Sequence, residues 1–261
     1  MEKKYRNLLD LLEPYVVSAQ PAQNWVGKEC LGRKLDQEHF FNPLSLKSQS
    51  FIERIYKLDA ITFGDQGMGM DKWVFFDCSV MPGFVFGYSI KGDKLNETDR
   101  KKLGIGINDY FPVSMYIAIP TMEKGVWFGH NLSSLNRHLS ISLSGLGLLT
   151  KLAGLQFFGI EKLRGATQWF SPALFIHTKI SRLKILSAYT PIHSKAETLC
   201  YECAVPKNLD VLEKSSNNLE VEGEFLFNTR KENLIKLQQK IDQGEEFSIS
   251  RVKSLNEIYL I

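Results

Sequence analysis

The sequence predicts an α+β fold that is built mainly from antiparallel sheet. Short runs of β-branched and aromatic residues recur between residues 73 and 205, and such runs are typical of strands. The last four runs are joined by short connections, which link antiparallel neighbours and not parallel strands. Strands and helices do not alternate regularly, and this disfavours a doubly wound nucleotide-binding sheet.

Length and composition predict a single domain over residues 1–261. Hydrophobic residues make up 44% of the chain, which is enough for a sizeable core. The 32 basic and 29 acidic residues are mixed along the chain, so no nucleic-acid partner is expected. The N-terminal stretch contains acids, and residues 139–160 contain several polar side chains, so neither an export signal nor a membrane span is expected. We expect a cytoplasmic protein with a small-molecule ligand, no membrane association, and a homo-oligomer as one possible state.

Residues 1–60 are expected to form a helical N-terminal region. Apolar residues at helical spacing predict an amphipathic helix over residues 3–18. A second helix is expected from Ser48 to Lys57, and the glycine-rich segment 64–69 then forms a turn.

Residues 61–206 are expected to form the antiparallel core. The runs WVFFDCSV and GFVFGYSI, joined by Met81-Pro82-Gly83, indicate a hairpin. Asn96 caps a short helix that has acids in its first turn and bases in its last turn. VSMYIAIP and GVWFGHNL are predicted strands, and residues 140–158 are predicted to form a packed helix.

Four more strand-like runs complete this core: KLRGATQW, ALFIHTKI, LKILSAYT and TLCYECAV. Cys200 and Cys203 have CxxC spacing within the last run, where residues three apart point to opposite faces. Reduced structural cysteines without a metal are therefore expected. A β-α-β extension over residues 207–261 follows, with the strand LEVEGEFLF, an amphipathic helix over residues 229–243 and a last strand ending at Ile261.

The segment from Gly129 to His138 is the densest group of polar residues among apolar ones. It includes His130, Asn131 and Ser133, and it leaves a predicted strand and enters a predicted helix. Backbone N–H groups at a helix N-terminus bind anions, so the segment is a candidate phosphate or carboxylate site. Capping of the strand and helix by the same side chains is the favoured alternative.

The second candidate is the segment 159–164, where the apolar helix gives way to a strand. A lysine desolvated among Phe157, Phe158 and Trp169, with Arg164 nearby, would have a lowered pKa and a neutral amine available to attack a carbonyl. A solvated lysine at a helix C-terminus is the favoured alternative, because buried lysines are uncommon.

From about Trp73 to Val205 the order of elements resembles the acetoacetate decarboxylase-like family. Gly159-Ile160-Glu161-Lys162 is similar to the G-x-P-K signature of that family, with Glu161 in place of proline. The resemblance implies a closed, barrel-like antiparallel sheet with flanking helices, and it implies that Lys162 is the Schiff-base lysine. It places the family's acid near Ser114, where this chain has no carboxylate, and Leu163 stands where the decarboxylases have a second lysine.

Three functions are compatible with these residues. The first is an enzyme, a lyase if the resemblance holds, in which Lys162 forms an imine with a keto acid or another carbonyl compound and needs neither cofactor nor metal. Its substrate contacts are expected from Arg164, His130, Asn131, Gln168, Trp169 and Ser114. The second is acyl transfer from coenzyme A on an acetyltransferase-like fold, with the pyrophosphate held by the segment 129–136 and the helix after it. The third is a non-enzymatic protein that binds an apolar carboxylate ligand in the same cavity.

Overall fold

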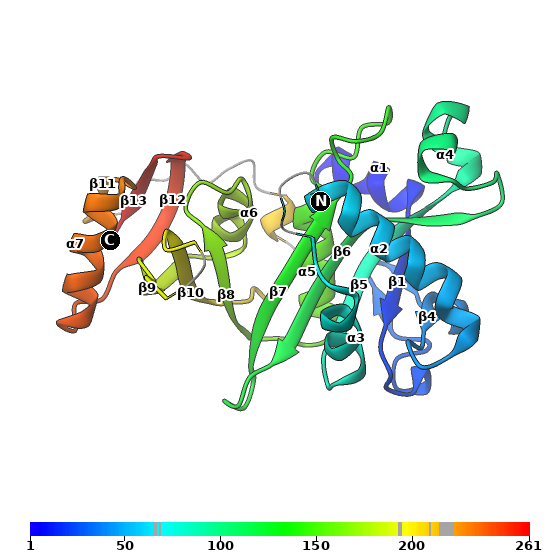
Figure 1. The fold of residues 1–261 in the computed structure, drawn as a ribbon, viewed down its shortest axis with the longest axis horizontal. Coiled ribbons are helices and arrows are strands. Elements are labelled where there is room, and N and C mark those ends of the chain that lie inside the picture. The colour runs from blue at the N-terminus through cyan, green and yellow to red at the C-terminus, as the bar shows by residue number, and fades with distance from the viewer. Residues whose placement is uncertain (65–66, 68, 193–194, 209, 214–221) are drawn as a thin grey trace. The chain divides into compact units, whose positions relative to one another are not determined.

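The computed structural model describes residues 1–64, 67, 69–192, 195–208, 210–213 and 222–261 (Figure 1). These residues form two units. The first comprises Met1–Pro120 and His130–Gly159, and the second comprises Thr121–Gly129 and Ile160–Ile261. The strand β7 (Val126–Ser134) contributes residues to both units. The expected single domain over the whole chain stays a prediction.

The first unit contains a mixed sheet whose strands follow the order β4, β1, β5, β6 and β7. The bounds of the first four are Phe40–Phe41 (β4), Glu13–Val17 (β1), Phe84–Lys91 (β5) and Tyr110–Pro120 (β6). β1, β5 and β6 are antiparallel to one another in turn, whereas β4 runs parallel to β1. A separate hairpin joins β2 (Glu29–Cys30) to β3 (Arg33–Lys34).

Helices complete the core of the first unit, and some of them pack on this sheet. They are α1 (Lys3–Leu11), α2 (Gln49–Phe63), α3 (Lys72–Val80), α4 (Glu97–Leu103) and α5 (Leu146–Phe157). Both α2 and α5 contact β6. Every residue of α5 except Gln156 is buried, as predicted for a packed helix. Asn96 accepts a hydrogen bond from the Asp99 N–H at 2.8 Å, which confirms the predicted cap of α4.

The second unit contains a mainly antiparallel sheet with the order β7, β8, β10, β9, β12, β13 and β11. Its strands are β8 (Lys162–Gln168), β9 (Leu183–Ser187), β10 (Thr198–Ala204), β11 (Phe225–Asn228), β12 (Ser248–Ser254) and β13 (Glu257–Leu260). Its helices are α6 (Ala173–Ile180) and α7 (Lys231–Asp242). Residues 219–221 of the predicted strand LEVEGEFLF lie outside the described residues.

The sheet is open in the described part of the chain. β4 and β11 stand at the ends of the strand orders, so the strands do not close on themselves. The α+β class and the mostly antiparallel pairing are confirmed, whereas the predicted closed barrel is wrong. Among the described helices, none is both long enough and apolar enough to cross a membrane.

Two segments predicted as strands are helices. WVFFDCSV lies in α3, which buries Phe75, Cys78 and Ser79 at helical spacing. ALFIHTKI forms α6, which begins after Pro172 and buries Leu174 and His177. A short apolar run fits both a buried strand and a buried helix, so local periodicity does not decide between them.

The N-terminal helix is shorter than predicted. α1 ends at Leu11, and β1 begins at Glu13 within the predicted helix. Pro14 explains the boundary, because proline disfavours a helix interior and keeps the residue before it extended.

Candidate functional site

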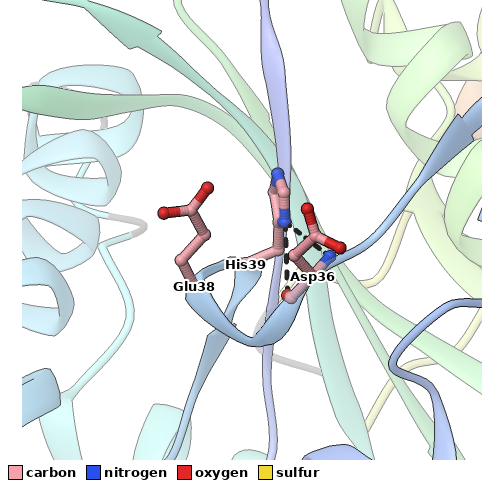
Figure 2. A group of neighbouring side chains, drawn as sticks. All are labelled: Asp36, Glu38 and His39. Atoms are coloured by element: carbon pink, nitrogen blue, oxygen red, sulfur yellow. Dashed lines mark hydrogen bonds between the residues drawn. The ribbon is translucent and has the colours of Figure 1, made fainter.

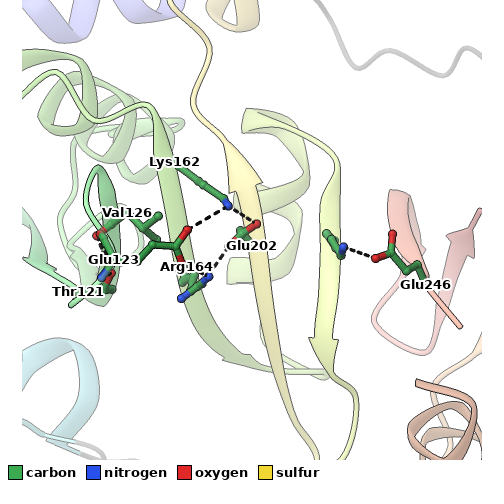
Figure 3. Close-up of polar contacts among 8 residues, drawn as sticks. Thr121, Glu123, Val126, Lys162, Arg164, Glu202 and Glu246 are labelled. Atoms are coloured by element: carbon green, nitrogen blue, oxygen red, sulfur yellow. Dashed lines mark hydrogen bonds and ion pairs between the residues drawn. The ribbon is translucent and has the colours of Figure 1, made fainter. Parts of the chain in front are cut away.

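Lys162 lies on the surface of the second unit, in a cluster of ion pairs (Figure 3). Its Nζ is 2.9 Å from Glu202 Oε1 and 3.7 Å from Glu123 Oε1. Arg164 donates from Nε to Glu202 Oε2 at 2.9 Å and from Nη2 to Glu123 Oε2 at 2.6 Å. Glu202 of β10 stands directly opposite Arg164 of β8. The cluster therefore ties together two neighbouring strands and the turn that precedes β7.

These contacts keep the Lys162 amine charged. The hydrogen bond to Glu202 raises the pKa of Lys162 above its ordinary value, and the side chain is 42% exposed. An imine-forming lysine has to be neutral when it attacks the carbonyl. The predicted imine-forming lyase is therefore wrong. The Lys162 amine was expected to be desolvated, but it is exposed to solvent and paired with carboxylates.

Gln168 and Trp169 lie at the other end of β8. Gln168 donates from Nε2 to Thr198 Oγ1, and the buried indole of Trp169 donates to the Ala188 carbonyl, both at 2.7 Å. At ~3.3 Å per residue, Gln168 lies roughly 20 Å along the strand from Lys162. The structure therefore does not bring these side chains together with Lys162, and their roles as ligand contacts stay predictions.

Ser114 is fully buried on β6 in the first unit. Its Oγ is 2.7 Å from Thr150 Oγ1 of α5, and it accepts a hydrogen bond from the Tyr88 N–H at 3.3 Å. These bonds attach α5 to the sheet. A role of Ser114 in ligand binding stays a prediction.

The polar segment 129–138 does not lead directly into a helix, as the sequence predicted. β7 continues to Ser134, and α5 begins only at Leu146. Asn131 donates from Nδ2 to Asp59 Oδ1 at 3.3 Å, and Ser133 Oγ contacts Asn131 Oδ1 at 3.2 Å.

Asp59 of α2 completes this polar group, and the sequence analysis did not predict its part in it. It is 4% exposed, and its Oδ2 accepts the Met70 N–H at 2.6 Å. Burial raises the pKa of Asp59, although the bonds from Met70 and Asn131 oppose the rise. Desolvation by the surrounding protein atoms also lowers the pKa of His130 on β7. Shifted pKa values are typical of functional sites, which makes this group a candidate.

The start of α5 has an unusual backbone. Gly145 has a φ of +90°, and a Cβ at this residue would lie 2.8 Å from the ring of Tyr5. Glycine is required there for both reasons. Ser144 is exposed immediately before it. The first turn of a helix carries N–H groups with partial positive charge, which attract anions.

The strands on either side of α5 in the sequence are parallel. The ladder between β7 and β8 runs from the pair Val126–Lys162 to the pair Gly129–Gly165.

Opposite Gly165 lies Tyr201 of β10, whose hydroxyl is 2.5 Å from the position that a Cβ at residue 165 would take. Tyr201 contacts His177 of α6, with ring centroids 5.2 Å apart, and both are buried. The sequence prediction missed this pair because it treated the segment of His177 as a strand.

The chain matches no protein-family model and no curated protein. Among solved structures it is similar to the ribosomal-protein-S18-alanine N-acetyltransferase from Escherichia coli, with 10% identity over 68% of this chain and 96% of that chain and a TM-score of 0.41. It is also similar to a CoA-dependent acyl-homoserine lactone synthase solved with SAM and isopentyl-CoA, with 10% identity over 88% of this chain and 90% of that chain and a TM-score of 0.42. These likenesses assign no family to the chain.

The resemblance to the acetoacetate decarboxylase-like family is wrong. The similar solved structures are acyltransferases and acyl-homoserine lactone synthases. The open sheet and the charged Lys162 contradict the barrel and the Schiff base that the resemblance implied.

Proposed function

We propose that the protein transfers an acyl group from a coenzyme A thioester to a nucleophilic acceptor. The observation that carries the proposal is the parallel crossover from β7 through α5 to β8. In sheets with parallel strands, ligands bind beyond the carboxyl ends of those strands. A helix N-terminus that follows such a strand is a phosphate-binding site. α5 follows β7 and begins at Leu146, and the N–H groups of its first turn are the phosphate site that we assign.

Coenzyme A suits this crossover for two reasons. Its pyrophosphate is an anion of the kind that a helix N-terminus binds. Its pantetheine arm is an extended chain with amide groups, and such chains form hydrogen bonds along a strand edge. β7 continues from His130 to Ser134 beyond its ladder with β8 and is the strand to which we assign this role.

The reaction exchanges a thioester for an amide or an ester. The acceptor nitrogen or oxygen attacks the thioester carbonyl, the new C–N or C–O bond forms, and the C–S bond breaks. The proton that the acceptor loses ends on the sulfur of coenzyme A.

Calorimetry with coenzyme A and the variant Ser144→Asp tests the donor site. An acid at this exposed position favours the helix dipole but repels a pyrophosphate. We expect binding to weaken about tenfold or more without a loss of thermal stability. Ser50→Asp places the same charge in the first turn of α2 and is the matched control. Equal affinities of the two variants would contradict the assignment of the pyrophosphate site.

Release of free coenzyme A from acetyl and longer acyl thioesters, measured with a panel of amines and alcohols, tests the reaction. If no thioester is consumed across the panel, acyl transfer is excluded even if coenzyme A binds.

A further inference from the structure

The first unit contains a half-open cavity of about 600 Å³ whose lining includes no residue of β7 or α5. Its walls come from the start of β1, the end of β5, the start of β6, helix α2 and the segment 33–41. A cavity of this volume is in the range that holds a small organic ligand.

The floor of the cavity is aromatic. The rings of Phe41 and Phe51 are stacked with centroids 3.9 Å apart, and Tyr15 meets Phe51 edge to face at 5.0 Å. The Tyr15 hydroxyl donates to the Ser114 carbonyl at 2.9 Å, so this phenol already has a hydrogen-bond acceptor within the protein. Such a floor favours an apolar or aromatic ligand body.

The two guanidinium groups in the wall are bound to protein acceptors. Arg33 donates to the Leu12 carbonyl at 3.0 Å and pairs with Glu13. Arg54 donates to Asp109 Oδ1 at 2.9 Å and to the Tyr110 carbonyl at 2.5 Å. A carboxylate ligand would have to displace these partners. With the exposed Lys34, the wall holds three cations against four carboxylates, those of Glu13, Asp36, Glu38 and Asp109, so the balance of charge favours a cation over an anion.

Two further carboxylates line the same wall, and that of Asp36 accepts the His39 N–H in a capping box. Asp36 and Glu38 are exposed and, within the described residues, neither is in an ion pair. Together with His39 they offer atoms that all lie within 4.8 Å of one another (Figure 2). Two carboxylates at this spacing attract a cation.

The histidine argues for an ammonium group and against a metal ion. His39 Nδ1 accepts the Asp36 N–H at 2.9 Å. In the neutral ring the proton then lies on Nε2, which is 3.8 Å from Glu13 Oε2. Nδ1 uses its lone pair for the Asp36 N–H and Nε2 carries the proton, so in this tautomer His39 keeps no lone pair for a metal.

We infer that this cavity binds a small amphipathic amine, whose apolar body packs on Tyr15, Phe41 and Phe51 and whose ammonium group lies at the carboxylates of Asp36 and Glu38. The inference does not depend on acyl transfer.

Calorimetry with 2-phenylethylamine at low ionic strength, on the full chain, tests this inference. The double variant Asp36→Asn, Glu38→Gln removes both charges and keeps an oxygen at position 36 that can cap the 3-10 helix Gln37–His39. We expect its affinity to be about tenfold lower than that of the unsubstituted protein. The matched control is Asp93→Asn, Glu97→Gln, which removes two exposed charges of the same unit outside the cavity and should leave the affinity unchanged.

Four results would overturn the inference. The first is no binding at millimolar concentration of 2-phenylethylamine, tryptamine or octylamine. The second is equal affinity of the two double variants. The third is tighter binding of 3-phenylpropionate, which has a similar body but an anionic group. The fourth is binding of Mn²⁺ alone that only the Asp36, Glu38 variant loses, because it would make the group a metal site. Coenzyme A binding and the Ser144→Asp result are separate readouts, so failure here leaves the proposed acyl transfer untouched.

Discussion

The amine of Lys162 lies 2.9 Å from the carboxylate of Glu202, which Arg164 also contacts at 2.9 Å. Lys162 begins β8 and Glu202 lies on β10, so the contact joins two strands that are 40 residues apart in the chain. Lys162, which the sequence analysis predicted to be the reactive residue, is therefore part of a surface ion-pair cluster. Such a cluster responds to pH and salt and does not supply a nucleophile.

We predict that Glu202→Gln removes an acid-sensitive part of the stability. Burial alone would raise the pKa of Glu202, but hydrogen bonds from Lys162 and Arg164 hold it below its ordinary value of 4.5. A carboxyl group with a lowered folded pKa stabilises the fold above its unfolded pKa, and this contribution is lost as the pH falls through the folded value. Urea midpoints should therefore fall more steeply below about pH 4.5 in the unsubstituted protein than in the variant. Glu161→Gln, at an exposed ion pair, is the control and should keep the steep fall.

We predict that Gly165→Ala destabilises the protein by about 1–3 kcal/mol, because the added methyl group would overlap the phenol of Tyr201 at 2.5–2.6 Å. Gly64→Ala is the control. Among the described residues, no heavy atom lies within 4 Å of the carbon that this substitution adds, and the backbone at Gly64 is right-handed helical, so the change should be neutral or stabilising by up to about 1 kcal/mol. Urea denaturation measures both, and a Gly165→Ala protein as stable as the control would show that Tyr201 moves aside freely.

We predict that Asp59→Asn gains stability, relative to the unsubstituted protein, as the pH rises. Burial raises the pKa of Asp59 above its ordinary value of 3.8, although Met70 and Asn131 oppose the rise. A carboxyl group whose pKa is higher in the folded than in the unfolded state contributes most to the stability at pH values below its unfolded pKa. This contribution to stability is lost as the pH rises through the folded pKa. Melting temperatures of the two proteins should therefore be similar near pH 3 and diverge in favour of the variant by about pH 7. A constant difference at all pH values would contradict the buried carboxylate. Asn131→Ala is a second probe and should destabilise more near pH 7, where the amide has an ionised partner.

We predict that Cys200 reacts with a thiol reagent before the other cysteines in the native protein. Burial raises the pKa of Cys30 to about 12, and Cys78 and Cys203 are also buried. Cys200 is only half-buried. The thiolate is the reactive form, so a buried thiol with a raised pKa reacts slowly. Cys200→Ser should abolish the fastest phase of labelling at about pH 8, whereas Cys30→Ser should leave it in place.

Elements defined by their own residues were predictable. The cap at Asn96 and the amphipathic pattern of α7 depend on neighbours within a few positions, and both elements form where the sequence placed them. The helices α3 and α6 were predicted as strands because their apolar residues fit either period over so short a run. The surface on which such a run packs decides between the two conformations.

The residue pattern was sufficient for the α+β class, the mostly antiparallel pairing and most strand positions, because hydrophobic periodicity and turn chemistry act between close neighbours in the chain. Long-range contacts decided the rest. The cavity assembles residues 13–15, 33–41, 51–54 and 108–110. The raised pKa of Lys162 follows from Glu202 of β10, which pairs with it across the sheet. Burial, charge pairing and pKa depend on neighbours in space, and these neighbours are far apart in the sequence and have no shared local signature.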